Sequence, residues 1–324
     1  MYRMVVRELG GPAALEVEES QSLAVGPGEV GIEVKAVGCN FFDILITQGK
    51  YQVRPELPFA PGAEVAGVVT DLGGGVEQFS RGDRVSALLT HGGYASAVSA
   101  PADRVFPIPS EMSFEDAAAA GLVYQTSHVA LVHRAGLRAG ETLLVHAAAG
   151  GVGLAAVQIG AALGARVIGT AGTKDKLELA RRNGADFVIN YRGEDWVARV
   201  NELTDGRGAD VIYDPVGGDT FDASTKCIAF EGRILIVGFA SGRIPTAAMN
   251  RVLLKNFSLV GIHWGLYFDK DPNVLHESQL ALSRMFAEGK IRPVVSRTFP
   301  LEEAQAALAA LGSRKTSGKI VLIP

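Results

Sequence analysis

The hydrophobic positions between about residue 124 and residue 264 form short apolar runs that alternate with amphipathic segments. The runs lie at residues 141–147, 165–171, 186–190, 209–214, 233–238 and 257–262. Helical spacing of apolar residues characterises the segments between them, such as 153–164, 174–182 and 194–203. Near-continuous apolar strands that alternate with helices indicate a parallel sheet covered on both faces. The pattern therefore predicts an α/β domain with a doubly wound six-stranded parallel sheet.

The two ends of the chain have a different pattern. Residues 1–123 carry short strand-like runs separated by Gly-Gly, Pro-Gly and Gly-Asp turns, which is typical of a β-rich domain. Residues 265–324 hold two helical stretches and a closing apolar run, and they are too few to bury a separate core. We therefore expect 1–123 and 265–324 to form one discontinuous domain around a central domain at 124–264.

Composition and charge narrow the class of protein. The chain has 324 residues, 48% hydrophobic and 20% charged, with a net charge of -4 and no block of Lys or Arg. These values predict a globular protein and argue against nucleic acid as the main partner. The start MYRMVVRELGG lacks a secretory apolar region, and no uninterrupted apolar stretch suits a membrane span. With only two cysteines, the expected location is cytoplasmic.

A glycine turn joins the first central strand to its helix. The G-x-G-x-x-G fingerprint of dinucleotide sites is present as Ala148-x-Gly150-x-x-Gly153. Gly150 allows a pyrophosphate to approach the backbone, and Gly153 allows the helix to pack closely on the strand. Ala148 is tolerated if its φ is negative. The alternative is a tight turn without a ligand, but the strand before it and the helix after it favour a nucleotide site.

The second central strand ends without the carboxylate that holds the ribose of NAD, because Ala171 stands there. The loop instead offers an N–H of Gly172, the hydroxyl of Thr173 and the ammonium of Lys176. The third strand adds Asn190-Tyr191-Arg192. These donors suit a 2′-phosphate and predict NADPH. In the alternative interpretation Thr173 only caps a helix, and Lys174 and Lys176 are solvated.

Several motifs along the whole chain resemble the zinc-independent, zeta-crystallin-like quinone oxidoreductases of the medium-chain dehydrogenase/reductase superfamily. They are Asn40-Phe-Phe-Asp43, Gly49-Lys-Tyr51, Pro61-Gly-Ala-Glu-Val-Ala-Gly-Val68, Gly82-Asp-Arg-Val85, HAAAGGVG, GTAGT, VINYR and YDPVGG. The early motifs are shared with zinc alcohol dehydrogenases. HAAAGGVG with GTAGT and VINYR points to the NADPH:quinone reductase branch.

The resemblance implies a GroES-like catalytic domain, split around a Rossmann domain, and assigns residues to the cofactor. Those implied to hold the adenosine 2′-phosphate are Gly172, Thr173, Lys176, Tyr191 and Arg192. Those implied to cradle the pyrophosphate are Ala149, Gly150, Gly151, Val152 and Gly153. Those implied near the nicotinamide are Asn40, Thr126, Gly238 and Phe239.

The resemblance also bears on metal binding. Zinc-dependent relatives place a Cys at the position of Asn40, a His at Ala63 and a third ligand near Leu122, and none of these residues binds zinc here. Two cysteines cannot form a four-cysteine zinc lobe, and the six histidines are scattered. The sequence therefore predicts no metal.

Hydride transfer from NADPH to a quinone or a conjugated carbonyl is the chemistry that remains. The Asn40 amide and the hydroxyls of Tyr51 and Thr126 are candidates to stabilise the developing oxygen anion. Some members of the family carry a second Tyr where this chain has Leu45, which weakens the expectation of a quinone. The alternatives are an enoyl-thioester or enone reductase of the same superfamily, and a non-catalytic NADPH-binding protein, as in lens crystallins.

The last central run, at 257–262, is expected at an edge of the sheet. An exposed edge invites pairing unless it is covered. In members of the family a twofold axis beside this strand joins two six-stranded sheets, so the sequence predicts a homodimer.

Overall fold

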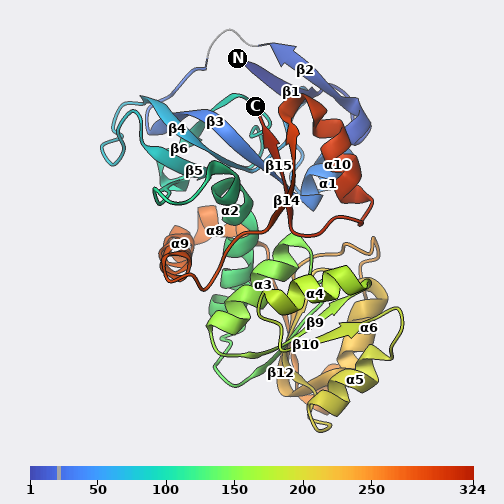
Figure 1. Cartoon of the computed structure of the whole chain (residues 1–324). Coiled ribbons are helices and arrows are strands. Elements are labelled where there is room, and N and C mark those ends of the chain that lie inside the picture. The colour runs from blue at the N-terminus through green and yellow to red at the C-terminus, as the bar shows by residue number, and fades with distance from the viewer. Residues whose placement is uncertain (20–22) are drawn as a thin grey trace. The chain divides into compact units, whose positions relative to one another are not determined.

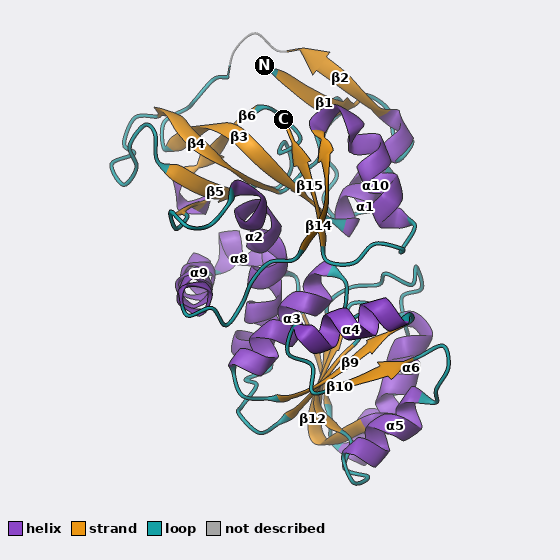
Figure 2. Cartoon of the chain, viewed as in Figure 1, coloured by secondary structure: helices purple, strands orange, loops and turns teal. Residues whose placement is uncertain are grey.

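A computed structural model describes residues 1–19 and 23–324 (Figures 1 and 2). The chain divides into two compact units, the first formed by Met1–Leu122 and Pro293–Pro324 and the second by Val123–Arg292. The chain first passes from one unit to the other after Leu122, one residue before the predicted boundary at residue 123. The chain returns to the first unit after Arg292 and not after residue 264, so residues 265–292 belong to the second unit rather than to the β-rich one.

The first unit is built on two antiparallel-rich sheets. In one, β1 pairs with β2; in the other the strand order is β14-β15-β3-β4-β5-β7, with β6 also pairing with β3. The strands are β1 (Tyr2–Val6), β2 (Leu15–Glu19), β3 (Glu29–Cys39), β4 (Glu64–Leu72), β5 (Arg84–Leu88), β6 (Ala97–Pro101), β7 (Val105–Pro107), β14 (Val295–Pro300) and β15 (Lys319–Ile323). The strand-like runs at 30–38, 64–76, 82–89 and 92–100 predict β3 to β6, but no such run predicts the short strands β1, β2 and β7.

The C-terminal strand closes this unit. β15 reads KIVLI and pairs antiparallel with β3, with Ile320 opposite Cys39 and Leu322 opposite Val37. β15 is buried over most of its length, as its apolar run requires, whereas β3 is buried at most positions but exposes Glu33. The chain end thus returns to the first unit.

The second unit contains the predicted six-stranded parallel sheet, which is confirmed in the order β10-β9-β8-β11-β12-β13. The strands are β8 (Thr142–Val145), β9 (Arg166–Ala171), β10 (Phe187–Asn190), β11 (Ala209–Asp214), β12 (Ile228–Ile236) and β13 (Ser258–Gly261). The order reverses between β8 and β11, the switch point at which doubly wound folds bind ligands. As expected, β13 lies at an edge.

Helices cover both faces of this sheet. α3 and α4 pack on β8, β9 and β10, whereas α6 packs on β11 and β12 and contacts α5. Gly160 allows α3 to approach β8 closely, because a Cβ there would lie 2.5 Å from Cδ2 of Leu143. The helices of this unit are α3 (Gly151–Ala162), α4 (Lys174–Arg182), α5 (Trp196–Leu203), α6 (Gly218–Cys227), α7 (Met249–Lys255), α8 (Tyr267–Lys270) and α9 (Pro272–Ala287), with a short turn of 3-10 helix at Trp264–Leu266.

Helix α9 explains why residues 265–292 join the second unit. It packs against a π-helical turn, Val129–Arg134, that continues α2 (Phe114–His128). The Gln125 side chain donates a hydrogen bond of 2.8 Å to Oε1 of Gln279 on α9. The remaining helices are α1 (Phe41–Thr47) and α10 (Ala304–Gly312), with 3-10 turns at Pro12–Ala14, Ala102–Arg104 and Leu301–Glu303.

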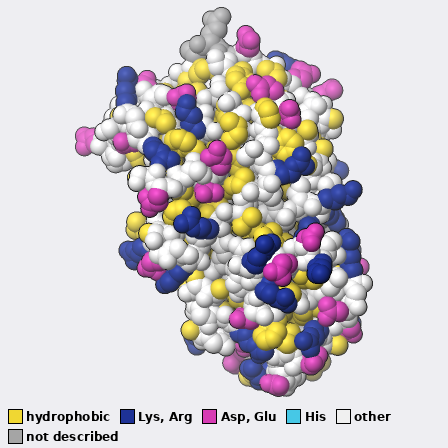
Figure 3. Space-filling view, viewed as in Figure 1, with side chains coloured by type: hydrophobic (Ala, Val, Ile, Leu, Met, Phe, Trp, Pro, Cys, Tyr) yellow, Lys and Arg dark blue, Asp and Glu magenta, His cyan; other side chains and the backbone are white. Residues whose placement is uncertain are grey.

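Positive and negative side chains are interspersed on the face drawn in Figure 3. Nothing on that face resembles the continuous basic stripe of a nucleic-acid-binding protein. Within residues 1–19 and 23–324, every helix is too short or too polar to cross a bilayer.

Candidate functional site

The glycine turn has the geometry that a dinucleotide site requires. Ala147 adopts a left-handed φ of 50°, while Ala148 is not among the residues with positive φ. A Cβ on Gly153 would lie 2.2 Å from the carbonyl oxygen of Ala147, so only glycine allows this tight passage from β8 into α3. The substitution of the first fingerprint glycine by Ala148 therefore leaves the turn intact.

The N-terminus of α3 lies directly after this turn. Gly150 is its N-cap, with an extended φ of -82°, and Leu154 is the first residue whose N–H returns to the carbonyl of Gly150. The N–H groups of Gly151, Val152 and Gly153 consequently have no partner within the helix. Together with the helix dipole they suit an anionic pyrophosphate. The backbone of Ala149 and Gly150 leads into the same turn.

The loop after β9 brings together the residues expected at the 2′-phosphate. A Cβ on Gly172 would lie 2.6 Å from the hydroxyl oxygen of Tyr191 and 2.9 Å from Nε of Arg192. Since β9 and β10 are neighbouring parallel strands, their carboxyl ends place these loops side by side. The position at which NAD enzymes carry the ribose-binding carboxylate is occupied by the buried Ala171, which has no carboxylate.

Thr173 and Lys176 complete this loop. Thr173 is the N-cap of α4, and its hydroxyl accepts the Lys176 N–H at 3.4 Å, so the predicted capping role is present. Burial and the nearby charge of Arg192 lower the pKa of Lys176. Two cations gathered at one loop repel each other, and a phosphate between them would relieve that repulsion. The residues present fit NADPH.

Asn40 lies at the end of β3 as the N-cap of α1 and is buried. Its amide nitrogen donates to Oε1 of Glu64 at 2.8 Å and to the carbonyl of Gly38 at 3.3 Å. Its amide oxygen accepts from Nζ of Lys319 at 2.7 Å. A bond from Asn40 to an acceptor would therefore replace the longer contact to Gly38.

The positions that hold zinc in the zinc-dependent relatives meet around Glu64. Oε2 of Glu64 accepts the N–H of Leu122 at 2.7 Å, and Oε1 accepts from Asn40 and Lys319. Ala63, beside Glu64, is buried and offers no ligand atom. Over residues 1–19 and 23–324 no three His, Cys, Asp or Glu side chains cluster as a metal site would need.

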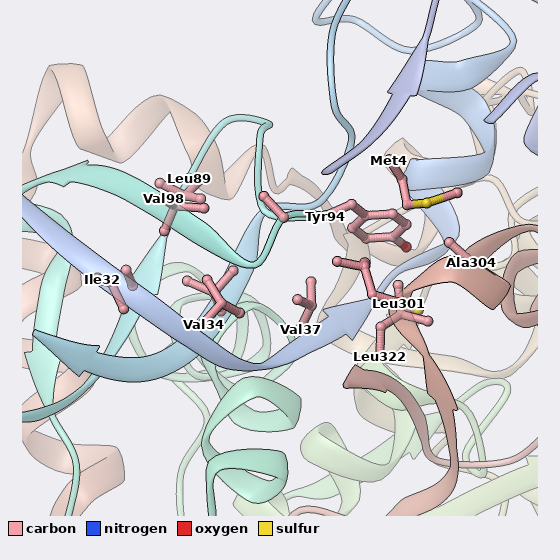
Figure 4. Packing of buried hydrophobic residues seen from close by; sticks show 14 of the residues in the cluster. Met4, Ile32, Val34, Val37, Leu89, Tyr94, Val98, Leu301, Ala304 and Leu322 are labelled. Carbon is pink, nitrogen blue, oxygen red and sulfur yellow. The ribbon is translucent and has the colours of Figure 1, made fainter. Parts of the chain in front are cut away.

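Asp43 organises the same region of the first unit. Its carboxylate accepts from the N–H of Asn40 at 2.7 Å, the N–H of Gly62 at 3.2 Å and the Tyr94 hydroxyl at 3.1 Å. Burial raises the pKa of Asp43 to about 7, although the hydrogen bonds from Asn40 and Tyr94 and the charge of Lys319 oppose the shift. Tyr94 is itself set in the apolar core beside Met4 and Leu301 (Figure 4).

Tyr51 lies near Asp43 and packs its ring against Phe42, with centroids 5.2 Å apart. Burial, and then the charge of Asp43, raise the pKa of the Tyr51 hydroxyl. The hydroxyl therefore stays protonated at neutral pH and keeps its hydrogen to donate.

The remaining expected residues belong to the second unit. Thr126 is buried in α2. Gly238 and Phe239 follow β12 and pack on the turn after β11, because a Cβ on Gly217 would lie 2.8 Å from the Phe239 ring. Asp214 shapes that turn by accepting the N–H groups of Val216 and Gly217 at 2.8 and 2.9 Å.

Sequence reasoning assigned no role to Lys319, Asp43, Tyr94 or Asp214. Asp43 and Asp214 lie within the motifs Asn40-Phe-Phe-Asp43 and YDPVGG, and this position was a signal that could have identified them. Lys319 is a charged residue at the start of an otherwise apolar strand. A lysine buried in such a strand needs an acceptor, and this was the available signal for a partner such as Glu64.

Two family models match the chain. The alcohol dehydrogenase GroES-like domain matches residues 26–110, and the zinc-binding dehydrogenase domain matches residues 151–279. The second span excludes Asn40, Ala63 and Leu122, so this match carries no information about the zinc-ligand positions.

Three relatives illustrate the similarity. A quinone oxidoreductase-like protein 2 homolog from Nematostella vectensis is 43% identical over 99% of this chain and 88% of its own length. The structure of Escherichia coli quinone oxidoreductase complexed with NADPH is 36% identical, covers 100% of both chains and has a TM-score of 0.93. The CurK enoyl reductase is 29% identical over 99% of this chain and 98% of its own, with a TM-score of 0.90.

Proposed function

Because this chain belongs to the zinc-independent quinone oxidoreductase branch of the medium-chain dehydrogenase/reductase superfamily, we propose that it reduces quinones or similar conjugated carbonyls with NADPH. The observation that carries the proposal is the cationic loop after β9. Lys176, Tyr191 and Arg192 gather around Gly172, where an NAD enzyme would have a carboxylate. The related structure complexed with NADPH supports the same cofactor.

The two ends of the cofactor are assigned to different residues. The pyrophosphate lies on the N–H groups of Gly151, Val152 and Gly153, beside the backbone of Ala149 and Gly150, and the 2′-phosphate is held by the loop around Gly172. The 2′-phosphate contacts come from Thr173, Lys176, Tyr191 and Arg192. The nicotinamide end is assigned to Thr126, Gly238 and Phe239, and Asn40 is assigned to the acceptor. The residues other than Asn40 belong to the second unit, and all of these except Thr126, which lies in α2, follow the carboxyl ends of its strands.

NADPH supplies the hydride when it is bound. The chain supplies orientation and hydrogen bonds to the acceptor oxygen, on which negative charge develops. Tyr51 is suited to this because burial keeps its hydroxyl protonated. Asn40 contributes through its second amide N–H, and Thr126 through its hydroxyl. An amide at position 40 cannot act as a general base, so alcohol oxidation is not favoured.

An enone or enoyl-thioester substrate is the second candidate. It is favoured by the likeness to the enoyl reductase and by Leu45, which stands where some family members have a second tyrosine. Such a substrate needs the same hydrogen bonds to its oxygen as a quinone does, because a conjugated carbonyl also accepts hydride and develops negative charge on that oxygen.

We further propose that the protein is a homodimer formed at the edge strand β13. The adjacent helix α7 exposes Met249, Leu253 and Leu254, with exposed fractions of 62%, 76% and 78%. Ile244, in the loop before it, is 71% exposed. Apolar side chains of this size beside an unpaired sheet edge suit a self-complementary twofold interface.

A cytoplasmic location is also proposed. Both cysteines, Cys39 and Cys227, are free and buried. Burial raises the pKa of each thiol to about 12, so neither is built for disulfide exchange.

An acceptor panel tests the function. NADPH oxidation is followed with 1,4-benzoquinone, 9,10-phenanthrenequinone, 2-cyclohexenone and crotonyl-CoA. Preference for the two quinones supports the proposal, and preference for crotonyl-CoA or cyclohexenone supports the second candidate. NADPH binding without turnover of any acceptor would identify a non-catalytic binding protein and refute both.

A further inference from the structure

Lys319 is a buried ammonium in the first unit. Its side chain is only 5% exposed, and its Nζ lies 2.6 Å from Oε1 of Glu64, 2.7 Å from the Asn40 amide oxygen and 2.8 Å from the Cys39 carbonyl. These three acceptors match the three hydrogens of an ammonium group. The charge is therefore fully hydrogen-bonded, as a buried charge requires.

This ammonium determines which way the Asn40 amide points. Lys319 only donates and the Glu64 carboxylate only accepts, so the amide oxygen must face Lys319 and the nitrogen must face Glu64. The flipped amide would set its NH₂ group against the ammonium and its oxygen against the carboxylate. The orientation of Asn40 is thus fixed by two charges of opposite sign.

The surroundings keep the pair in place. Glu64 is 1% exposed, and its other oxygen accepts the N–H of Leu122. A Cβ on Gly38 would lie 2.2 Å from the Ala118 carbonyl and 2.4 Å from Oε1 of Glu64, so only glycine leaves room for this carboxylate. Tight packing therefore surrounds the Glu64 carboxylate.

We propose that Lys319 is a positioning residue for hydride transfer, which holds the Asn40 amide so that its second N–H is offered to the acceptor. The inference rests on the proposed function. That second hydrogen is used only in the 3.3 Å contact to Gly38 and is the one that a ligand can take over. Lys319 itself does not touch the reacting atoms.

Lys319→Met alone leaves Glu64 as a buried unpaired charge, and part of its effect would be loss of stability. The informative variant is Lys319→Met/Glu64→Gln, which removes both charges and keeps an acceptor for Asn40. The variant also removes the acceptor of the Leu122 N–H and the donor to Cys39, so we expect a melting temperature below that of the wild type but above that of Lys319→Met, with unchanged NADPH affinity. We expect kcat to fall about ten- to a hundredfold, the range for a lost hydrogen bond to a charged group. Lys315→Met, at an exposed site in the turn before β15, is the matched control.

Adding Asn40→Ala separates positioning from packing. In the wild-type background this change should lower kcat, and in Lys319→Met/Glu64→Gln it should cause little further loss. The proposal is overturned if the double variant recovers kcat together with stability, or if Asn40→Ala lowers kcat by the same factor in both backgrounds. A wild type that reduces no acceptor of the panel would instead refute the proposed function, and this inference with it.

Discussion

The hydroxyl of Tyr191 lies so close to Gly172 that it leaves no room for a side chain at that position. An ideal Cβ on Gly172 would lie 2.6 Å from that oxygen, a separation that real Cβ atoms do not tolerate. Tyr191 follows β10 and Gly172 follows β9, so the two loops meet only because these strands are neighbours. The contact lies at the proposed 2′-phosphate site.

We predict that Gly172→Ala displaces the Tyr191 side chain and weakens NADPH binding. NADH, which lacks the 2′-phosphate, should lose less affinity. Gly193→Ala is the matched control, because a Cβ there meets only the Asn190 side chain, at 3.8 Å. Isothermal titration with both cofactors measures the effect. Equal losses for NADPH and NADH would contradict a phosphate site at this contact.

Lys176→Ala should reduce the preference for NADPH over NADH. One hydrogen bond to a charged group contributes about 1.5–3 kcal/mol, which is about ten- to a hundredfold in affinity. Lys174→Ala, at an exposed position two residues earlier in the same helix, should leave the ratio of the two dissociation constants unchanged. Wild-type protein that binds NADH and NADPH equally would refute the assignment.

His146 should make the protein less stable in mild acid. It is fully buried between the Thr170 and Ser224 hydroxyls, at 3.1 and 2.9 Å, and burial lowers its pKa to about 3. Below pH 6.5 the unfolded chain binds a proton at this histidine that the folded protein does not bind. The free energy of unfolding should therefore fall by about 1.4 kcal/mol per pH unit between pH 6 and 4 from this group.

Urea unfolding of wild type and His146→Asn across this pH range measures the contribution. The variant should be less stable at pH 7. Its free energy of unfolding should change less steeply with pH, by about 1.4 kcal/mol per pH unit, which corresponds to one proton. His128, whose pKa burial lowers to about 4, adds to the slope in both proteins. Identical slopes would mean that His146 is not kept neutral by the fold.

Charge on helix α7 should disrupt the proposed dimer. Leu253→Asp/Leu254→Asp places two carboxylates on the most exposed apolar positions beside β13. We expect sedimentation to show a dimer for the wild type and a monomer for the variant at micromolar concentration. Leu9→Asp, at a 54% exposed apolar position in the first unit, is the control and should remain dimeric. A monomeric wild type would contradict the interface.

The parallel sheet could be predicted because its strands are buried on both faces and read as apolar runs. The short strands β1 and β2 could not, since buried and exposed residues do not alternate along YRMVV or LEVEE, and five residues give a weak signal. The placement of residues 265–292 depended on the packing of α9 against the π-helical turn at 129–134, a tertiary contact that no local pattern encodes.

The glycine turn at Gly153 and the absence of an acid at Ala171 could be identified from the sequence, because a backbone shape demands glycine at the first and the second is a residue type. Lys319 was missed because its partners, Asn40 and Glu64, lie more than 250 residues earlier in the chain. Only the pairing of β15 with β3 brings them together. A long-range ion pair of this kind leaves no periodic signal.

The central claim is that turnover needs NADPH and no metal, and it is tested most directly on one chelated sample. After exhaustive chelation, zinc content and the rate of NADPH-dependent quinone reduction are measured together. Since Asn40, Ala63 and Leu122 occupy the zinc-ligand positions of the relatives, we expect less than stoichiometric zinc and an undiminished rate. Stoichiometric zinc in the untreated protein, with loss of turnover on its removal and recovery on its return, would contradict the account.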